Sequence, residues 1–356
     1  MKVIMMNGGL GNQLFQYIFF RVIEIVSGDD CYIDDHHFSL HDEHNGYEIE
    51  SIFGLKPKML KDRFEPAEWQ SILEEYRKHG NMIGILGRRN IELSLYTEST
   101  SMYRDGTSKT GVPYRGQAYM FDGTNAVFFP DASKIRPSLR DNLAACFPKR
   151  LKTFLKERLS RALYQKKTMQ SPPQATREYI EQVHMLDENL YFYGYWIDVR
   201  WFQSIREQIL QELRFPPFDE PDDFNPAMLV RIQSSDSVSV HVRRGDFLSY
   251  NIALDASWYG KHIEVMRKRS ADPVFFLFSD DLSWCRQNKE ALGFREDDKL
   301  VFVDGNTGEN SFRDMQLMSC CKNMIIANSS FSYLAALLNQ TPGKVVLAPA
   351  GGPEIL

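Results

Sequence analysis

The sequence predicts an α/β protein in which two parallel-sheet halves are joined by a proline-rich linker. The amino terminus reads as a strand, a tight turn, a helix and a second strand. After residue 226, short apolar runs alternate with helical patterns of about ten to fifteen residues, the spacing of βαβ units. Between these parts, residues 216–226 contain four prolines, which disfavour regular structure.

Length and composition agree with a globular protein of this size. The chain has 356 residues, of which 43% are hydrophobic and 25% charged. This composition excludes disordered and collagen-like chains, and a net charge of -5 argues against a surface that binds nucleic acid throughout. Five cysteines, odd in number and without metal-ligand spacing, indicate reduced thiols. Because polar residues interrupt the apolar amino terminus, we expect neither a signal peptide nor a membrane anchor there. We therefore expect a cytoplasmic protein.

The first half begins with an apolar strand at residues 3–6, a turn at 7–9, a helix at 10–26 and a strand at 31–33. Residues 50–137 follow no clear period, so we assign no strands there and expect a polar surface loop near 97–116. Further along we expect two helices, an apolar strand and a last helix, at residues 149–167, 174–186, 191–196 and 198–213.

The second half contains five apolar runs, which we predict to be the strands of a Rossmann-like sheet. They are residues 237–242, 274–279, 300–304, 324–328 and 345–349. The predicted domains are therefore residues 1–215 and 227–356, joined by the linker 216–226. Ligands of such sheets lie at the carboxyl ends of the strands, so the residues after each run are the candidates for binding and chemistry.

The string HVRRGD follows the first of these runs with two adjacent arginines, Arg243 and Arg244. Neighbouring side chains of an extended chain point in opposite directions. One guanidinium can therefore bind a diphosphate while a carboxylate such as Asp246 holds the other, which we expect to be Arg244. The alternative is a purely structural cluster of arginine and aspartate. His241 precedes the arginines, and Asp280 and Asp281 follow the second run.

The fourth run continues through Ser329 and Ser330 into a helix whose first amides are unpaired. Such a helix start is a phosphate site, although Ser330 or Ser332 can equally serve as a helix cap. Asp314, one helix earlier, can accept hydrogen bonds from the N1 and N2 edge of guanine, or it can be a surface carboxylate.

The amino-terminal turn imitates a dinucleotide-binding fingerprint, with Gly9 and Gly11 in the turn and Asp34 about 20 residues on. Leu14 occupies the position of the third glycine, which weakens this interpretation. An NAD-dependent oxidoreductase is therefore the alternative function. Otherwise, the glycines bring backbone and the Asn12 amide up to a cleft between two domains.

Other polar groups favour no metal site. The adjacent acids Asp280 and Asp281 can hold a divalent ion, but the arginines already supply positive charge. His36, His37, His41 and His44 lack ligand spacing and are expected to be solvated. Residues 149–167 carry a net charge of +7 and predict a helix with a solvated basic side or a contact with an anionic membrane surface.

Taken in order, the blocks NGGLGNQLFQY, YGYWIDVRWF, HVRRGD, FSDDLSWC and NSSFSYLAALLN resemble those of the α-1,2-fucosyltransferases of glycosyltransferase family 11. The resemblance implies a GT-B architecture, with two Rossmann-like domains facing across a cleft. It also implies inverting, metal-independent transfer of L-fucose from GDP-β-L-fucose to the 2-hydroxyl of a terminal galactose, without a cofactor. The implied partners are GDP-fucose and a β-galactoside, with no nucleic acid and with peripheral membrane contact through residues 149–167.

The resemblance also implies roles for individual residues. Arg243 binds the β-phosphate and stabilises the leaving GDP, and Asn12 faces the reacting sugar. Asp246 is a candidate base by motif position. The implied donor-binding residues are His241, Arg244, Asp280, Asp314, Ser329, Ser330, Phe331, Gly9 and Gly11. A silent protein that only binds a sugar nucleotide or glycan is a third possibility, which a product assay separates from the enzyme.

Overall fold

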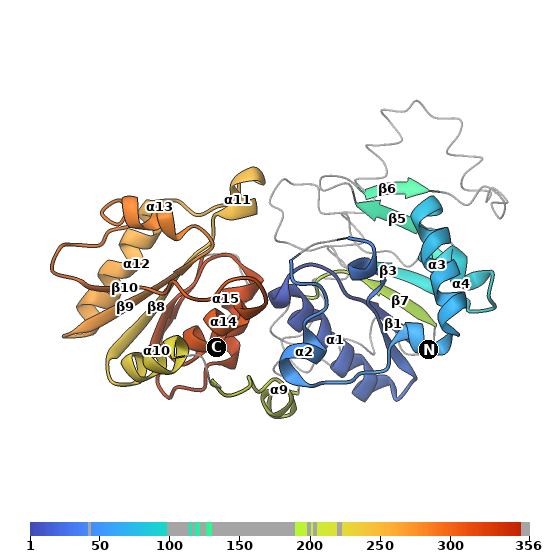
Figure 1. Ribbon diagram of the computed structural model, residues 1–356, viewed down its shortest axis with the longest axis horizontal. Helices are drawn as coiled ribbons and strands as arrows, with labels where there is room; N and C mark the ends of the chain where they lie inside the picture. Colours follow the sequence, from blue (N-terminus) through green and yellow to red (C-terminus); the bar gives the residue numbers. More distant parts are fainter. Residues whose placement is uncertain are drawn as a thin grey trace, which may run out of the picture.

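The computed structural model of the chain contains two five-stranded sheets, one in each half, and a two-stranded sheet (Figure 1). Each five-stranded sheet is covered by helices on both faces. The structure describes residues 1–41, 44–97, 114–115, 118–121, 126–129, 189–197, 201, 205–218 and 223–349.

In the amino-terminal half the strand order is β2-β1-β7-β3-β4. All pairs are parallel except β3 with β4, which is antiparallel. The strands of the two sheets in this half are β1 (Lys2–Met5), β2 (Cys31–Asp34), β3 (Ser94–Thr97), β4 (Tyr114–Arg115), β5 (Ala118–Phe121), β6 (Ala126–Phe129) and β7 (Leu190–Tyr193). The helices are α1 (Leu10–Ser27), η1 (His36–Ser39), α2 (Ile49–Phe53), η2 (Leu60–Arg63), α3 (Pro66–His79), α4 (Met82–Gly87) and α9 (Arg206–Glu212).

In the carboxyl-terminal half the order is β10-β9-β8-β11-β12, and every pair is parallel. The strands are β8 (Asp236–Val242), β9 (Pro273–Ser279), β10 (Lys299–Phe302), β11 (Asn323–Ile325) and β12 (Val346–Leu347). The helices are α10 (Phe224–Gln233), α11 (Gly245–Ser249), α12 (Ala256–Arg269), α13 (Leu282–Gln287), η3 (Gly308–Asn310), α14 (Phe312–Ser319) and α15 (Ser330–Leu338). Numbered along the chain, this order is 3-2-1-4-5, that of a Rossmann sheet.

Alternating side chains of β1 and of Met6, the residue after it, show how the core is built. Ile4 and Met6 belong to a cluster with the apolar face of α1, whereas Val3 and Met5 pack with α3 and α4. The first cluster continues into α14 and α15 of the other half. In Figure 1 these two helices accordingly lie on the side of the carboxyl-terminal half that faces α1. A third cluster fills the opposite face of the second sheet, beneath α12 and α13.

The predicted α/β class and the two Rossmann-like sheets of a GT-B architecture are confirmed. All five predicted strands of the second half are present, as are the first strand, helix and second strand of the first. The predicted strand at 191–196 ends three residues early, because the chain turns after Tyr193 and Trp196 adopts a positive φ of 55°.

The segment 50–137, for which the sequence pattern assigns no strands, holds α2, α3, α4 and the strands β3 to β6. Two local predictions differ from the structure. The predicted surface loop 97–116 includes the strand β4, which pairs with β3. The linker prediction extends too far, because α10 begins at Phe224 and places Pro226 in its first turn, where proline is tolerated. The division into domains there stays a prediction.

The predicted helices 149–167 and 174–186 lie outside the described residues. Within the described part of the chain, no helix combines the length and apolar composition that crossing a bilayer requires.

Candidate active site

The candidate site lies where the strand order of the second sheet reverses, between β8 and β11. Connections leave these neighbouring strands toward opposite edges of the sheet, and the gap between the two loops is the usual ligand position of such folds. The loops are tied together, since the Asn328 side chain donates a hydrogen bond to the Ile252 carbonyl at 2.8 Å. The structure therefore places the arginines and the start of α15 at one sheet edge.

Arg243 contacts two carboxylates at this edge. Its Nη2 donates to Asp246 Oδ1 at 2.7 Å, and its Nη1 lies 3.1 Å from Asp280 Oδ2. The guanidinium also lies 5.4 Å from the centre of the Phe247 ring. The prediction that Asp246 holds Arg244 is wrong: the chain turns into α11 after the arginines, and this turn brings Asp246, three residues on, back to Arg243.

Arg244 is held by other groups. Its backbone N–H donates to Asp280 Oδ1 at 2.9 Å, and its Nε donates to Asp281 Oδ2 at 3.3 Å. Its guanidinium lies 3.5 Å from the centre of the Trp284 ring, a cation–π contact. Trp284 is not among the residues predicted from the sequence. The signal for it was an aspartate, Asp281, at a helix start three residues before the tryptophan. In the structure Asp281 caps α13 by accepting a hydrogen bond from the Trp284 N–H.

The arginines and their partners bear on anion and metal binding. Two guanidiniums face three carboxylates, so an incoming diphosphate has to compete for Arg243. Asp246, with 44% of its side chain exposed against 23% for Asp280, is the partner that can yield. Asp280 and Asp281 are engaged by arginine, and no group of three or more acidic, histidine or cysteine residues that could hold a metal occurs within the described ranges. Metal independence stays a prediction.

Some of the buried polar atoms that lack a hydrogen-bond partner lie at this edge. Among the residues that the structure describes, they include His241 Nδ1, Arg243 Nε and Asn328 Oδ1. Leaving such groups unpaired costs about 1–3 kcal/mol each, and a polar ligand bound at this edge would offer them partners.

His241 is 5% exposed, and its ring centre lies 5.8 Å from that of Phe331. Burial, helped by the positive charge of Arg243, lowers the pKa of His241 to about 3. The imidazole is therefore neutral at physiological pH, with one ring nitrogen as donor and the other as acceptor.

The start of α15 supplies further hydrogen-bond donors. Ser329 is the N-cap residue but its side chain makes no capping bond. The hydroxyl of Ser330 instead donates to Asn12 Oδ1 at 2.6 Å, and that of Ser332 bonds the carbonyls of Ala327 and Ser329. The capping alternative therefore does not describe these serines, and among the first amides of α15 that of Phe331 lies close to Gly11 of α1.

Asn12 comes from α1 of the other half, so this contact joins the two halves. A Cβ on Gly11 would lie 2.4 Å from the backbone nitrogen of Phe331, which shows that only glycine allows this approach. The structure thus gives Gly11 a packing role. Gly9 is the N-cap of α1 and lies beside the ring of His44.

Gln13 and Gln16 were missed as organisers of this turn. Gln13 donates to the carbonyls of Gly8 and Gly46 and accepts from the Glu48 N–H, while Gln16 exchanges hydrogen bonds with Asn7. Their amides lie on the buried side of an otherwise apolar helix, and that position was the signal in the sequence.

Asp314 lies apart from the arginine cluster, in the first turn of α14. It accepts a hydrogen bond from Asn306 Nδ2 at 2.8 Å, and Asn306 is paired in turn with Asn225. Burial raises the pKa of Asp314 to about 7. The hydrogen bond from Asn306 acts in the opposite direction, and the negative charge of Asp304 raises the pKa further.

The structure does not support the dinucleotide-binding interpretation, because Asp34 is not available to bind a ribose. Asp34 is completely buried, accepts from the Tyr191 hydroxyl at 2.7 Å and lies 2.9 Å from His36 Nδ1. Leu14 is likewise buried in the core. The prediction of a solvated His36 is wrong, because its ring packs against Tyr76 at 4.4 Å with 1% of the residue exposed.

Comparison with known proteins gives the family. The model described as glycosyl transferase family 11 matches residues 126–353. An α-1,2-colitosyltransferase of Escherichia coli is 39% identical over 164 residues, 44% of this chain and 54% of that protein. A galactoside α-(1,2)-fucosyltransferase 2 of Rattus norvegicus is 29% identical over 156 residues, 41% of this chain and 43% of that protein. The chain thus spans about half the length of the curated relatives that it matches. The solved fucosyltransferase NodZ from Bradyrhizobium is 12% identical, with 99% of this chain and 96% of that chain covered and a TM-score of 0.45.

Proposed function

The chain belongs to glycosyl transferase family 11, and from this we propose that it is an inverting α-1,2-fucosyltransferase. The reaction moves L-fucose from GDP-β-L-fucose to the 2-hydroxyl of a terminal galactose in a glycan acceptor. Relatives named for α-1,2 transfer of colitose and of fucose support the linkage. Colitose is therefore the competing donor sugar to test.

One observation carries the proposal: Arg243, with a buried Nε that lacks a partner in the described chain, follows His241 by two residues, and the ring of His241 lies 5.8 Å from that of Phe331 at the start of α15. When the bond from fucose to GDP breaks, negative charge develops on the β-phosphate oxygen. A fixed guanidinium and the first amides of a helix stabilise that charge more than they stabilise the ground state. This accelerates departure of GDP without a metal or cofactor.

The remaining donor contacts follow from position. The loop of Ser329, Ser330 and Phe331 lines the diphosphate, and neutral His241 offers a hydrogen bond to the donor. Asp314, at the β10 side of the sheet, accepts from the guanine edge. Arg244 is engaged by Asp280 and Asp281 and shapes the loop that carries Arg243.

The acceptor approaches from the amino-terminal half. Asn12, together with Gly9 and Gly11 at the start of α1, faces α15 across the junction between the halves. Attack on the face opposite GDP converts the β donor into an α product. Asp246 is the carboxylate of the motif, but its hydrogen bond to Arg243 favours a positioning role over that of a base. Cytoplasmic location and membrane contact through residues 149–167 stay proposals that rest on sequence alone.

The test incubates the purified chain with GDP-fucose or GDP-colitose and a panel of β-galactosides, and measures GDP release and product linkage. We expect an α-1,2-linked product from the wild type. Arg243→Ala should lower kcat by at least about a hundredfold, the cost of losing one charged transition-state contact. Arg295→Ala is the matched control, because Arg295 is exposed and pairs with Glu264 away from the site. Wild-type turnover by Arg243→Ala, or a product with another linkage, would contradict the proposal.

A further inference from the structure

Tyr250 follows the last residue of α11 and is 51% exposed. Leu248, two residues earlier, is exposed to a similar extent, 50%. Single exposed apolar side chains are ordinary, so the position of Tyr250 relative to the candidate site has to carry the argument. Figure 1 shows α11 at the upper edge of the carboxyl-terminal half, on the side toward the amino-terminal half.

Helical spacing places Tyr250 on the same side of α11 as the partners of Arg243. Asp246 and Phe247 precede it by four and three residues, and such residues are neighbours on a helix surface. Both of them contact the Arg243 guanidinium. Leu248, in contrast, is two residues from Tyr250, and residues at this spacing lie on different sides of a helix.

Hydrogen bonds hold the segment around Tyr250 in place. The Tyr250 N–H donates to the Asp246 carbonyl at 3.1 Å, and the Ile252 N–H donates to that of Phe247 at 3.0 Å. Ile252 is fixed in turn by Asn328 from the loop after β11. The exposed ring is thus presented by a backbone that is anchored to both loops of the candidate site.

Resting on the proposed function, we propose that Tyr250 binds the acceptor by packing its ring against the apolar face of the galactose. The acceptor must lie next to the fucose that leaves the diphosphate, and Tyr250 is one helical turn from the side chains that hold Arg243. A pyranose has one face of C–H groups, against which an aromatic ring can pack. Tyr250 would then determine which acceptors bind, without touching the donor.

The experiment compares Tyr250→Ala, Tyr250→Phe and the matched control Leu248→Ala with lactose as acceptor. We expect Tyr250→Ala to raise the KM for lactose about tenfold, the effect of ~1.4 kcal/mol, and the other two to stay within about twofold of the wild type. The KM for GDP-fucose and the slow hydrolysis of GDP-fucose without acceptor should not change. Saturation-transfer NMR with lactose should show contact to galactose protons that is lost in Tyr250→Ala.

Equal lactose KM and equal saturation transfer in Tyr250→Ala and Leu248→Ala would overturn the Tyr250 assignment while the proposed function stands. A change of molar mass in Tyr250→Ala with unchanged lactose KM would overturn it too, and assign the ring to a contact between copies of the chain. A wild type that neither hydrolyses nor transfers fucose from GDP-fucose would refute the proposed function, and the Tyr250 proposal with it.

Discussion

Two ionisable side chains of the candidate site have pKa values shifted in opposite directions. Burial and Arg243 lower the pKa of His241 to about 3, whereas burial raises that of Asp314 to about 7. Burial disfavours the charged form of either group, which for the histidine is the protonated form and for the aspartate the ionised one. Between pH 5 and 8 His241 therefore stays neutral, and Asp314 changes its charge.

The titration of Asp314 predicts how donor binding depends on pH. In the proposed contact only the ionised carboxylate can accept both N–H groups of the guanine edge, so affinity should be highest above pH 7 and fall as pH decreases through it. We expect the Kd for GDP-fucose to rise about five- to tenfold from pH 8 to pH 6, as measured by calorimetry. GDP-fucose is the probe because its diphosphate carries the sugar and does not titrate in this range.

Asp314→Asn is the matched variant for this prediction, since it keeps the shape and the contact with Asn306 but cannot ionise. Its Kd for GDP-fucose should be higher than that of the wild type at pH 8 and nearly independent of pH. If Asp314→Asn retained the pH dependence of the wild type, another group would be responsible and the guanine contact would be refuted.

Individual site residues could be predicted where sequence position alone determines the location. His241, Arg243 and Ser330 lie at one sheet edge because β8 and β11 are parallel neighbours, and their roles stay predictions. The partner of Asp246 could not be predicted, because it depends on the backbone after Arg244. An extended chain would pair Asp246 with Arg244, whereas the helical turn in the structure pairs it with Arg243. The role of Gly11 depends on Phe331, more than 300 residues away, and no local pattern contains that information.

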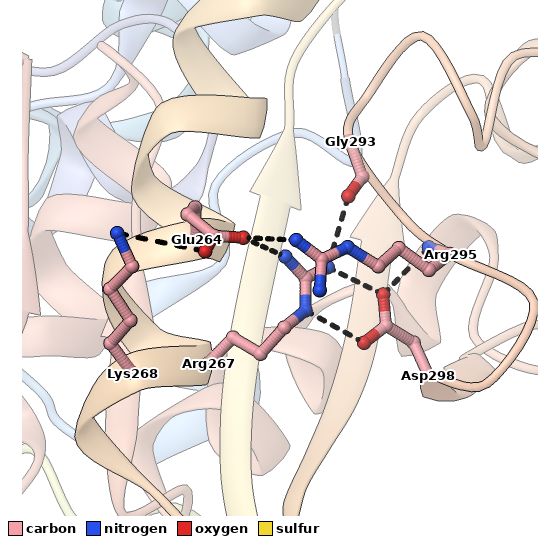
Figure 2. Close-up of polar contacts among 6 residues, drawn as sticks. All are labelled: Glu264, Arg267, Lys268, Gly293, Arg295 and Asp298. Carbon is pink, nitrogen blue, oxygen red and sulfur yellow. Dashed lines mark hydrogen bonds and ion pairs between the residues drawn. The ribbon is translucent and has the colours of Figure 1, made fainter.

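At the scale of the elements, an ion-pair network fastens α12 to the loop before β10 (Figure 2). Arg267 donates to both oxygens of Asp298, at 3.0 and 2.7 Å, and to the Gly293 carbonyl at 3.0 Å. Glu264 accepts from Arg267 and Arg295. The Asp298 side chain is 6% exposed and that of Arg267 15%, so this pair is shielded from water.

Removing Arg267 should destabilise the fold, because it leaves a shielded carboxylate without its partner. We expect Arg267→Met to lower the free energy of unfolding by about 2 kcal/mol, as measured by urea denaturation. If the two halves unfold in separate steps, the loss should appear in the step of the carboxyl-terminal half. Lys268→Ala is the control, since Lys268 is 76% exposed and should change stability by less than about 0.5 kcal/mol. Similar losses for both variants would contradict a specific role for the network.

The same pair predicts acid sensitivity. Burial by itself would raise the pKa of Asp298, but hydrogen bonds from Arg267 and from the Arg295 backbone outweigh it and lower that pKa. The contribution of Asp298 is therefore complete above the ordinary carboxyl pKa near 4 and is lost as pH falls through the lower, folded-state value. Arg267→Met should accordingly lose less stability than the wild type on acidification below pH 4.

Elements were predictable where their pattern is strong and local. The five strands of the second sheet are short apolar runs, and α1 has a clear helical period that ends at Gly28, whose φ is 65°. α3 was missed because its exposed side is highly polar, although Pro66 at its start and Gly80 after its end are typical helix boundaries. Short strands such as β4, with two residues, are fixed by pairing with β3 and leave no pattern of their own.

At the scale of the whole molecule, the two halves meet along α1 and α15. One continuous apolar cluster includes Phe15 of α1 and Tyr333 of α15. Polar contacts reinforce this junction: Ser330 donates to Asn12, and Asn45 Nδ2 donates to Ser311 Oγ at 3.1 Å. The junction therefore sets how the start of α1 faces the loop of Ser329 and Ser330, and by this contact the packing of the halves should influence the proposed reaction.

Gly11 is the position where this coupling can be tested with one methyl group. In Gly11→Ala the new Cβ would lie 2.4 Å from the Phe331 nitrogen and 2.7 Å from the Ser330 carbonyl carbon, so the two helices must separate. Overpacking of this kind costs about 1–3 kcal/mol, and we expect the unfolding temperature to fall by several degrees and kcat/KM for fucosyl transfer by at least about tenfold. Gly87→Ala is the matched control, because nothing lies within 4 Å of a Cβ there, and alanine at this end of α4 should leave stability unchanged or slightly higher. Equal stability and turnover of the two variants would show that the contact between α1 and α15 does not control the reaction.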